Sequence, residues 1–264
     1  MKLRKLYLFF ILLQLNMFAL DTITIAGTGS SQKLLRILAV QFEKDNPNTH
    51  INIPNSIGSG GGIRNTALGT SDLGRVARNI KNSEKKYNLN YMLFAYSPVV
   101  FVTNESVKNL HNLDTQQITD IYTGKIKTWE EVGAKKGKIY VASREIGDAS
   151  KDILDKNIKE FAKISNPVGE IQFSSPKMLS VLTNFKNTIG YLSYPETVGT
   201  TLNILSINNI KPNIQNIKNN SYPFYAPLGI VYKNNIKPLS KKFLIFLSSE
   251  KAKKIIINNG AITI

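Results

Sequence analysis

Three short stretches rich in glycine and serine carry groups suited to binding a small anion. Their sequences are GTGSS at 27–31, GSGGG at 58–62 and GDAS at 147–150. Each follows a strand-like segment and precedes a helix-like one, and a helix N-terminus presents unpaired N–H groups and about half a positive charge. Glycine lets the backbone approach a ligand, and serine adds a hydroxyl donor, although ordinary helix caps use the same residues. Three such turns together can surround a tetrahedral oxyanion with donors.

Two arginines stand where they can add a fixed positive charge to this arrangement. Arg144 ends a predicted strand, so its side chain is expected to point into a cleft at the carboxyl edge of the sheet. Its guanidinium can bind an oxyanion with two bonds and does not lose its proton. An ion pair with Glu145 or Asp148 is the alternative. Arg78 has the same candidate role after another strand-like segment, whereas Arg75 is expected at the surface.

The chain lacks the residues of several common catalytic and nucleotide-binding sites. Neither of the first two turns has the last glycine of G-x-G-x-x-G, and no G-K-[S/T] follows any turn, so the anion is not expected to belong to a nucleotide. The absence of cysteine excludes disulfides and thiolate chemistry. The two histidines, His50 and His111, stand in unlike contexts. We expect no catalytic residue, no metal site and no cofactor, since a phosphatase would need a metal cluster or an activated nucleophile.

Composition describes a globular protein with an excess of positive charge. The 264 residues are 42% hydrophobic and 20% charged, which allows one large domain or two modest ones. Lys and Arg number 34 against 18 Asp and Glu, a net charge of +16 that favours an anionic partner. The lysines are scattered, so a solvated surface is the simpler interpretation. Stacking aromatics among basic residues are limited to Tyr87 and Tyr91 near Lys85, and no nucleic-acid partner is expected.

The first 20 residues are typical of a secretory signal peptide. A basic start at 2–5 precedes a nearly wholly apolar stretch at 6–15, which is too short to span a membrane. Cleavage near residue 20 predicts a periplasmic protein. The alternative is an uncleaved segment that anchors the protein in the membrane.

Strand and helix patterns alternate along the rest of the chain. The strand-like segments 22–26, 50–53 and 138–142 each lead through one of the three turns into a helix-like segment. This alternation implies an α/β fold with largely parallel sheets.

The order of these motifs resembles that of the phosphate-binding proteins of phosphate ABC transporters, which are type II periplasmic binding proteins. Besides the three turns, the chain has DLG at 72–74, IYTGKIKTWEEVG at 121–133 and IGY at 189–191. The stretch through Trp129 is the most specific to the family, and we interpret Trp129 itself as core packing. The resemblance covers about residues 22–195.

The resemblance implies two α/β lobes that are joined by two crossing strands and enclose a central anion cleft. The strand-like segments 93–102 and 189–194 fit the crossings. Proteins of this kind close like a hinge around their ligand. The expected division is a signal peptide at 1–20, a first part of lobe one at 21–97, lobe two at 98–195, and a second part of lobe one at 196–264.

The resemblance also implies a phosphate site built from the three turns and the two arginines. Side chains of the turns and backbone N–H groups would share the contacts. The expected ligand-binding residues are Ser30, Ser31, Gln32, Ser59, Gly60, Arg78, Arg144, Asp148, Ala149 and Ser150.

Two positions depart from the family pattern. Ala77 stands where an Asp or Ser is common, and Asp148 replaces the first serine of the third turn. A carboxylate beside a dianion is costly in a water-poor cleft, but phosphate keeps a proton that a carboxylate can accept, and sulfate does not. Our hypothesis is that Asp148 accepts this proton in place of the residue missing at Ala77. The alternative is that Asp148 only caps the following helix.

The function expected from this resemblance is that of a monomeric extracytoplasmic protein that captures inorganic phosphate. It would deliver the phosphate to a membrane-embedded ABC permease without covalent chemistry. Two alternatives use the same fold: a binder of another oxyanion, such as molybdate or sulfate, and a phosphate sensor or adhesin that takes no part in transport.

Overall fold

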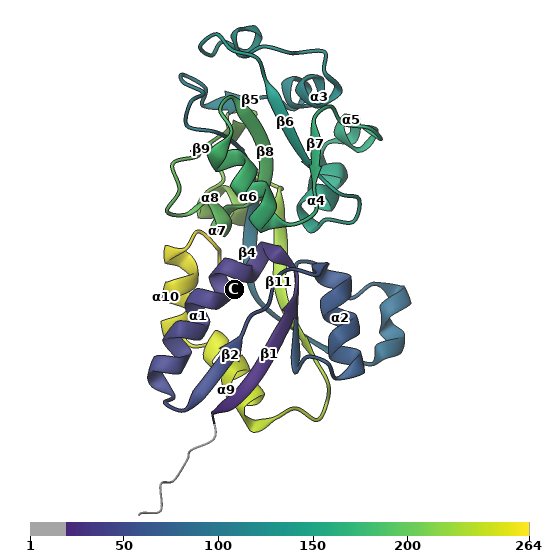
Figure 1. The fold of residues 1–264 in the computed structure, drawn as a ribbon, viewed down its shortest axis with the longest axis vertical. Coiled ribbons are helices and arrows are strands. Elements are labelled where there is room, and N and C mark those ends of the chain that lie inside the picture. The colour runs from purple at the N-terminus through teal and green to yellow at the C-terminus, as the bar shows by residue number, and fades with distance from the viewer. Residues whose placement is uncertain (1–19, 264) are drawn as a thin grey trace, which may run out of the picture.

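A computed structural model describes residues 20–263, and these residues form two lobes placed end to end (Figure 1). All but the last residue of the expected signal peptide lie outside the described residues. Lobe 1 is the lower lobe of Figure 1 and contains both ends of the described chain. Its elements are β1 (Asp21–Gly27), η1 (Gly29–Ser31), α1 (Gln32–Asp45), β2 (Thr49–Asn52), α2 (Gly58–Leu68), β3 (Leu73–Val76), η2 (Asn82–Tyr87), β11 (Tyr225–Tyr232), α9 (Pro238–Leu247) and α10 (Glu250–Asn258).

Helices cover both faces of the strands of lobe 1. α1 forms because Leu34, Leu38 and Phe42 recur at helical spacing, and all three are buried in one cluster with side chains of α9 and α10. α2 covers the opposite face, where Ile63 packs against Val76 of β3. The result is the three-layer arrangement that the alternation of strands and helices predicts.

Lobe 2 has the same layered construction around an aromatic core. Phe101, Tyr122, Phe161 and Tyr191 pack with ring centroids 5.0–6.1 Å apart. Trp129 is fully buried in the same cluster, which confirms its expected role in the core. The elements of lobe 2 are β5 (Asn112–Leu113), α3 (Thr115–Thr123), η3 (Trp129–Val132), β6 (Tyr140–Arg144), α4 (Ala149–Asn157), α5 (Lys159–Ala162), β7 (Glu170–Gln172), α6 (Ser175–Asn184), β8 (Thr188–Ser193), α7 (Tyr194–Thr197), β9 (Asn203–Ile204), β10 (Ser206–Ile207) and α8 (Ile214–Lys218).

One long strand, β4 (Asn90–Thr103), connects the lobes. Its first part pairs with β11 in lobe 1, and its second part, from Val99 onward, pairs with β8 in lobe 2. The strand order within the described residues is therefore β2-β1-β3-β11-β4-β8-β6-β7, with β9 also paired to β4. The expected crossing at 93–102 corresponds to this strand.

The chain returns to lobe 1 later than the sequence led us to expect. The segment 189–194 is mostly β8, an inner strand of lobe 2 between β4 and β6. Residues 203–224 also belong to lobe 2, because β9 and β10 pair with β4 and β5 and because Tyr222 and Phe224 join its core. The Tyr222 hydroxyl donates to the Val99 carbonyl at 2.8 Å. The return therefore falls at Tyr225, where β11 begins, and not near residue 195.

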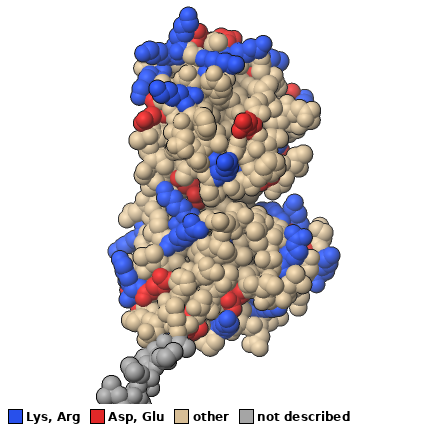
Figure 2. Space-filling model, in the orientation of Figure 1, with Lys and Arg blue, Asp and Glu red and all other residues tan. Residues whose placement is uncertain are grey.

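Basic side chains are spread over the surface of both lobes. Figure 2 shows Lys and Arg across this face, gathered most densely at the end of lobe 2 that lies far from lobe 1. This distribution agrees with a solvated basic surface. Among residues 20–263, no helix has the length and apolar composition needed to cross a membrane.

Candidate anion-binding site

The three predicted turns meet where the two lobes face each other (Figure 1). β1 and β3 run parallel with Gly27 opposite Arg75, so both strands end at the same edge of the sheet. The Ile57 N–H donates to the Gly27 carbonyl at 3.0 Å and ties the second turn to the first. From lobe 2, the start of α4 contacts β11, and Ala149 packs into the core of lobe 1. Turns from both lobes therefore surround one region.

Lobe 1 contributes two buried serine hydroxyls to this region. Ser31 stands at the N-cap position of α1 but makes no side-chain cap, and its Oγ has no hydrogen-bond partner among the described residues. Buried polar groups without partners are rare, which makes this hydroxyl a strong candidate ligand contact. Ser59, in the first turn of α2, accepts the Ala77 N–H at 3.1 Å. That bond uses an oxygen lone pair, so the Ser59 proton remains able to donate.

Ser30 and Gln32 hold the first turn in place. The Ser30 carbonyl accepts the Ser193 hydroxyl at 2.8 Å, and Ser193 lies 2.6 Å from the Ser97 hydroxyl. This chain of bonds links the first turn to β8 and β4. Gln32 donates its N–H to the Gly29 carbonyl and accepts from a buried arginine through its side chain. Both residues therefore make bonds that fix the turn. Contrary to expectation, the Gln32 N–H is already bonded within the turn and is not free to donate to a ligand.

Arg144, at the end of β6, is the residue of lobe 2 that brings a positive charge to this region. Its side chain is 4% exposed. Nε donates to the Gln172 carbonyl at 2.8 Å and to Glu145 at 2.9 Å, while Nη2 lies 3.0 Å from Glu145 and 2.8 Å from Asp148. Nη1 donates to the Ser175 hydroxyl at 3.3 Å. The two ion pairs that the sequence suggested for Arg144, with Glu145 and with Asp148, are therefore both present.

Asp148 combines that ion pair with a helix cap. Its Oδ1 accepts the N–H groups of Ser150 and Lys151 at 3.0 and 3.1 Å, which makes it the N-cap residue of α4. Burial raises the pKa of Asp148, although the charge of Arg144 and the two N–H bonds oppose that rise. The cap occupies the Ser150 N–H, whereas the Ala149 N–H takes no part in it. The alternative considered for Asp148, a helix cap, is therefore present.

Arg78 lies beside the second turn but is bound to a carboxylate. Its two terminal nitrogens donate to Glu84 at 2.7 Å each. A Cβ atom built on Gly60 would lie 3.7 Å from Arg78 Nη2, so the guanidinium is next to the start of α2. Across the junction, burial raises the pKa of Asp152 on α4 while the charges of Lys81 and Arg78 lower it. Arg78 thus lies at the boundary of the lobes with its charge already paired.

The arrangement matches a known family along most of the chain. Residues 17–251 match the PBP superfamily domain. The chain belongs to the PBP superfamily. The phosphate-binding protein PstS of Bacillus subtilis is 25% identical over 244 residues, which cover 91% of this chain and 80% of that protein. PstS of Borreliella burgdorferi is 25% identical over 249 residues, which cover 90% and 88%.

Solved structures of this superfamily share the two-lobe architecture. A putative phosphate ABC transporter substrate-binding protein from Clostridium perfringens, with bound phosphate, has a TM-score of 0.79 and 29% identity, covering 92% of this chain and 100% of that one. An ABC-type phosphate transport receptor from Vibrio cholerae has a TM-score of 0.66 and 25% identity, with the same coverage. The expected two-lobe α/β fold of type II periplasmic binding proteins is confirmed.

Three residues near the site of this PBP-superfamily protein were missed or misjudged from the sequence. Ser175 begins α6 and accepts a hydrogen bond from Arg144, and a Cβ atom on Gly29 would lie 2.9 Å from its Oγ, so Ser175 lies next to the first turn. The Tyr191 hydroxyl accepts the Arg144 N–H at 3.1 Å. The SSP sequence at 174–176 is a helix-start signal that points to Ser175. Arg75, expected at the surface, is fully buried because its side chain binds backbone carbonyls beneath the turns.

Proposed function

We propose that this protein is a monomeric extracytoplasmic solute-binding protein that captures inorganic phosphate between its lobes and delivers it to an ABC permease. The observation that carries the proposal is the buried Ser31 hydroxyl, which has no partner among the described residues. Ser175, whose hydroxyl accepts a hydrogen bond from Arg144, lies beside Gly29 of the same turn. Relatives named as phosphate-binding proteins, and a similar structure with bound phosphate, support phosphate as the anion.

Phosphate would bind by bridging donors from the two lobes. Ser31 and Ser59 supply hydroxyls from lobe 1, and Arg144 and the start of α4 supply a charge and a helix N-terminus from lobe 2. An anion held from both sides favours the closed arrangement of the lobes, because opening would remove half of its contacts. No covalent step is needed, and we propose no catalytic role for either serine.

Glu145 is the partner of Arg144 that phosphate can displace. Its side chain is 29% exposed, whereas that of Asp148 is 6% exposed and also caps α4. Rotation of Glu145 into solvent would free one Nη2 hydrogen of Arg144 for the oxyanion, while Nε stays bonded to the Gln172 carbonyl and Nη2 stays bonded to Asp148. Glu145 therefore competes with phosphate for the arginine.

Asp148 would remain in place and accept the proton of phosphate. Its Oδ2 makes one bond to Arg144, and a carboxylate oxygen can accept more than one hydrogen bond. Ala77, bonded to Ser59 through its N–H, has no side-chain acceptor to offer. A fully deprotonated anion such as sulfate would face this negative charge without a compensating bond, so Asp148 favours phosphate.

Exposed apolar side chains beside the turns are candidates for contact with the permease. Ile146 is 91% exposed, Phe173 is 75% exposed and Ile57 is 47% exposed. Each directly precedes a turn of the junction: Ile57 leads into α2, Ile146 into the α4 turn, and Phe173 into α6. Apolar residues from both lobes thus flank the anion site, and exposed apolar patches of this kind commonly mark protein contacts.

Calorimetric titration of the purified protein, stripped of ligand, tests the proposal. Phosphate, sulfate and molybdate would be titrated separately. The proposal requires tight phosphate binding with no heat from sulfate. Binding of molybdate or sulfate without phosphate would instead favour another oxyanion. Absence of binding by all three would favour a protein that uses this fold without capturing these anions.

A further inference from the structure

Arg75 is a fully buried arginine directly beneath the anion-binding turns. It lies in β3 and is 0% exposed. None of the ion pairs formed among residues 20–263 includes Arg75. Burial lowers the pKa of Arg75 to about 10, with a further contribution from the charge of Arg36, while Glu196 opposes the change. The side chain therefore stays protonated at neutral pH.

Its guanidinium binds the two turns that carry the serines. Nε donates to the Thr28 carbonyl at 2.7 Å, and Nη2 donates to the Pro54 carbonyl at 2.7 Å and to Gln32 Oε1 at 3.3 Å. Nη1 donates to the Ile25 carbonyl. Thr28 and Gln32 flank Ser31, and Pro54 belongs to the loop that leads to Ser59. One side chain thus holds the backbones on which both hydroxyls depend.

The acceptors of Arg75 are neutral oxygens, so they stabilise its positive charge by hydrogen bonds but do not neutralise it. A buried charge without a counter-ion is costly, and a nearby anion would reduce that cost. The charged groups that act on Arg75 are Arg36 of α1, which is repulsive, and Glu196 of α7, which is attractive. A doubly charged ligand gains more from this field than a singly charged one.

We propose that Arg75 is a positioning residue of the anion site, which sets both serine turns through its four acceptors and favours a dianion through its uncancelled charge. This inference rests on the proposed phosphate binding. It is distinct from the direct contacts assigned to Arg144, because Arg75 lies below the turns and acts through them.

Two substitutions separate the roles of geometry and charge. Arg75→Lys keeps the charge but cannot make all four bonds, so phosphate affinity should fall about tenfold with its pH dependence retained. Arg75→Met removes the charge, so affinity should fall about 100-fold or more. In the Met variant, the rise in affinity between pH 6 and pH 8, where phosphate changes from monoanion to dianion, should also be smaller than in wild type, although Arg144 still favours the dianion. Arg64→Met, which removes an exposed arginine of α2, is the matched control and should stay within about twofold of wild type.

The measurement is the Kd of phosphate at pH 6, 7 and 8 by calorimetry, with thermal unfolding to verify that each variant is folded. A folded Lys variant with wild-type affinity overturns the inference, even if the Met variant does not fold. A folded Met variant that keeps the wild-type ratio of affinities at pH 6 and pH 8 overturns it as well. If wild-type protein binds no phosphate, the proposed function fails together with the inference. If wild type binds and the variants match it, only the role of Arg75 fails.

Discussion

The carboxylate of Asp148 lies 2.8 Å from the guanidinium of Arg144, and its other oxygen caps α4. One side chain thus fixes the strand that ends in Arg144 relative to the helix that follows it. The same carboxylate lies where an anion would meet the N-terminus of α4. A change at Asp148 would therefore affect three things at once: the orientation of Arg144, the cap of α4 and the net charge of the candidate site.

Asp148→Asn tests whether that carboxylate selects phosphate. Asn keeps an oxygen that can cap α4, so the helix should remain. Because the amide is a weaker acceptor and carries no charge, phosphate affinity should fall about 10- to 100-fold, and sulfate binding should become measurable. Calorimetry with both anions measures the change, and Asp155→Asn, farther along α4, is the control. A small loss for phosphate with sulfate still silent would mean that Asp148 is only a cap.

Glu145→Gln should raise the affinity for phosphate. The substitution removes the partly exposed carboxylate that occupies Nε and Nη2 of Arg144. Since exposed ion pairs contribute up to about 1 kcal/mol, the gain should be about two- to fivefold. Glu170→Gln on β7 is a control of the same charge change. A loss of affinity in Glu145→Gln would show that Glu145 orients the arginine and does not compete for it.

Ser31→Ala and Ser59→Ala should each weaken phosphate binding about 10- to 100-fold, because each removes a hydrogen bond to a charged ligand. The two variants should differ in stability. Ser31 Oγ has no partner among the described residues, so its removal should not lower the free energy of unfolding, whereas Ser59→Ala removes the acceptor of the Ala77 N–H. Calorimetry and urea denaturation measure both effects, with the exposed Ser180→Ala as control. Unchanged affinity in Ser31→Ala would remove that serine from the site.

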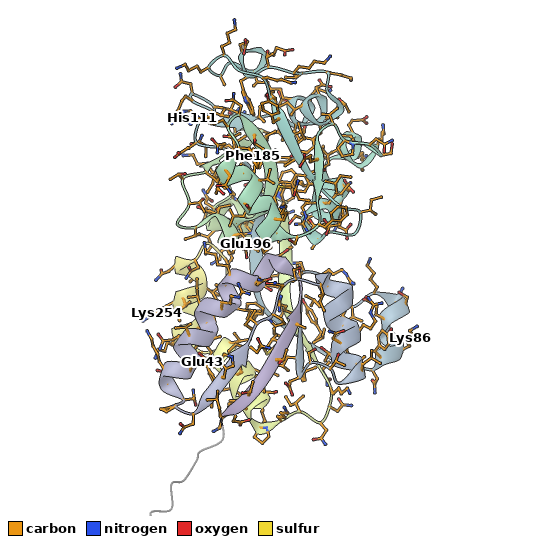
Figure 3. The ribbon with its side chains drawn as sticks, in the orientation of Figure 1. Glu43, Lys86, His111, Phe185, Glu196 and Lys254 are labelled. Atoms are coloured by element: carbon orange, nitrogen blue, oxygen red, sulfur yellow. The ribbon has the colours of Figure 1, made fainter. Side chains whose placement is uncertain are left out.

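Glu196 gives the protein a pH-dependent stability. It lies between the two lobes, near the start of α1 (Figure 3), and its Oε1 accepts the Lys33 N–H at 3.2 Å. Burial raises the pKa of Glu196 to about 7, although the Lys33 N–H and the charges of Lys33, Arg36 and Arg75 oppose the rise. In the unfolded chain its pKa is about 4.3. The stability that this residue contributes is therefore complete below about pH 4.3 and is lost as pH rises towards 7.

Glu196→Gln should consequently be more stable than wild type at pH 8. The difference in the free energy of unfolding should be about 3 kcal/mol at pH 8 and smaller at pH 5, since Gln does not ionise and can still accept the Lys33 N–H. Urea denaturation at both values measures it, with the exposed Glu250→Gln as control. A difference that is the same at pH 5 and pH 8 would contradict the raised pKa.

Ile146→Ser and Phe173→Ser should impair delivery to the permease without impairing capture. Both side chains are mostly exposed and the substitutions add no charge beside the anion site, so the fold should persist and the phosphate Kd should stay within about twofold of wild type. Phosphate uptake by cells that depend on this protein should fall several-fold, because a small polar side chain would weaken an apolar contact. Ile245→Ser, at an exposed isoleucine on α9, is the control. Normal uptake in both variants would place the permease contact elsewhere.

Local patterns were enough to predict the layers and the turns. The spacing of Leu34, Leu38 and Phe42 predicted α1, and the three glycine- and serine-rich stretches lie at the starts of α1, α2 and α4, as expected. Trp129 was placed correctly in the core, because a lone tryptophan inside an apolar pattern can bury a large area.

Features that depend on distant parts of the chain could not be predicted in the same way. The return to lobe 1 was expected near residue 195, but β9 and β10 first pair with strands that lie about 100 residues earlier. Arg75 was expected at the surface, where most arginine side chains lie. Its partners include the backbone carbonyl oxygens of Thr28 and Pro54. Every residue has such a carbonyl, so the sequence does not show which ones will bind an arginine.

A crystal structure of the protein with phosphate would show whether the anion lies between the lobes. We expect one phosphate ion there, within hydrogen-bond distance of the Ser31 and Ser59 hydroxyls and of the Arg144 guanidinium, with Glu145 turned away. Phosphate bound elsewhere, or lobes that meet at these turns with Arg144 still held by Glu145 in saturating phosphate, would contradict this expectation.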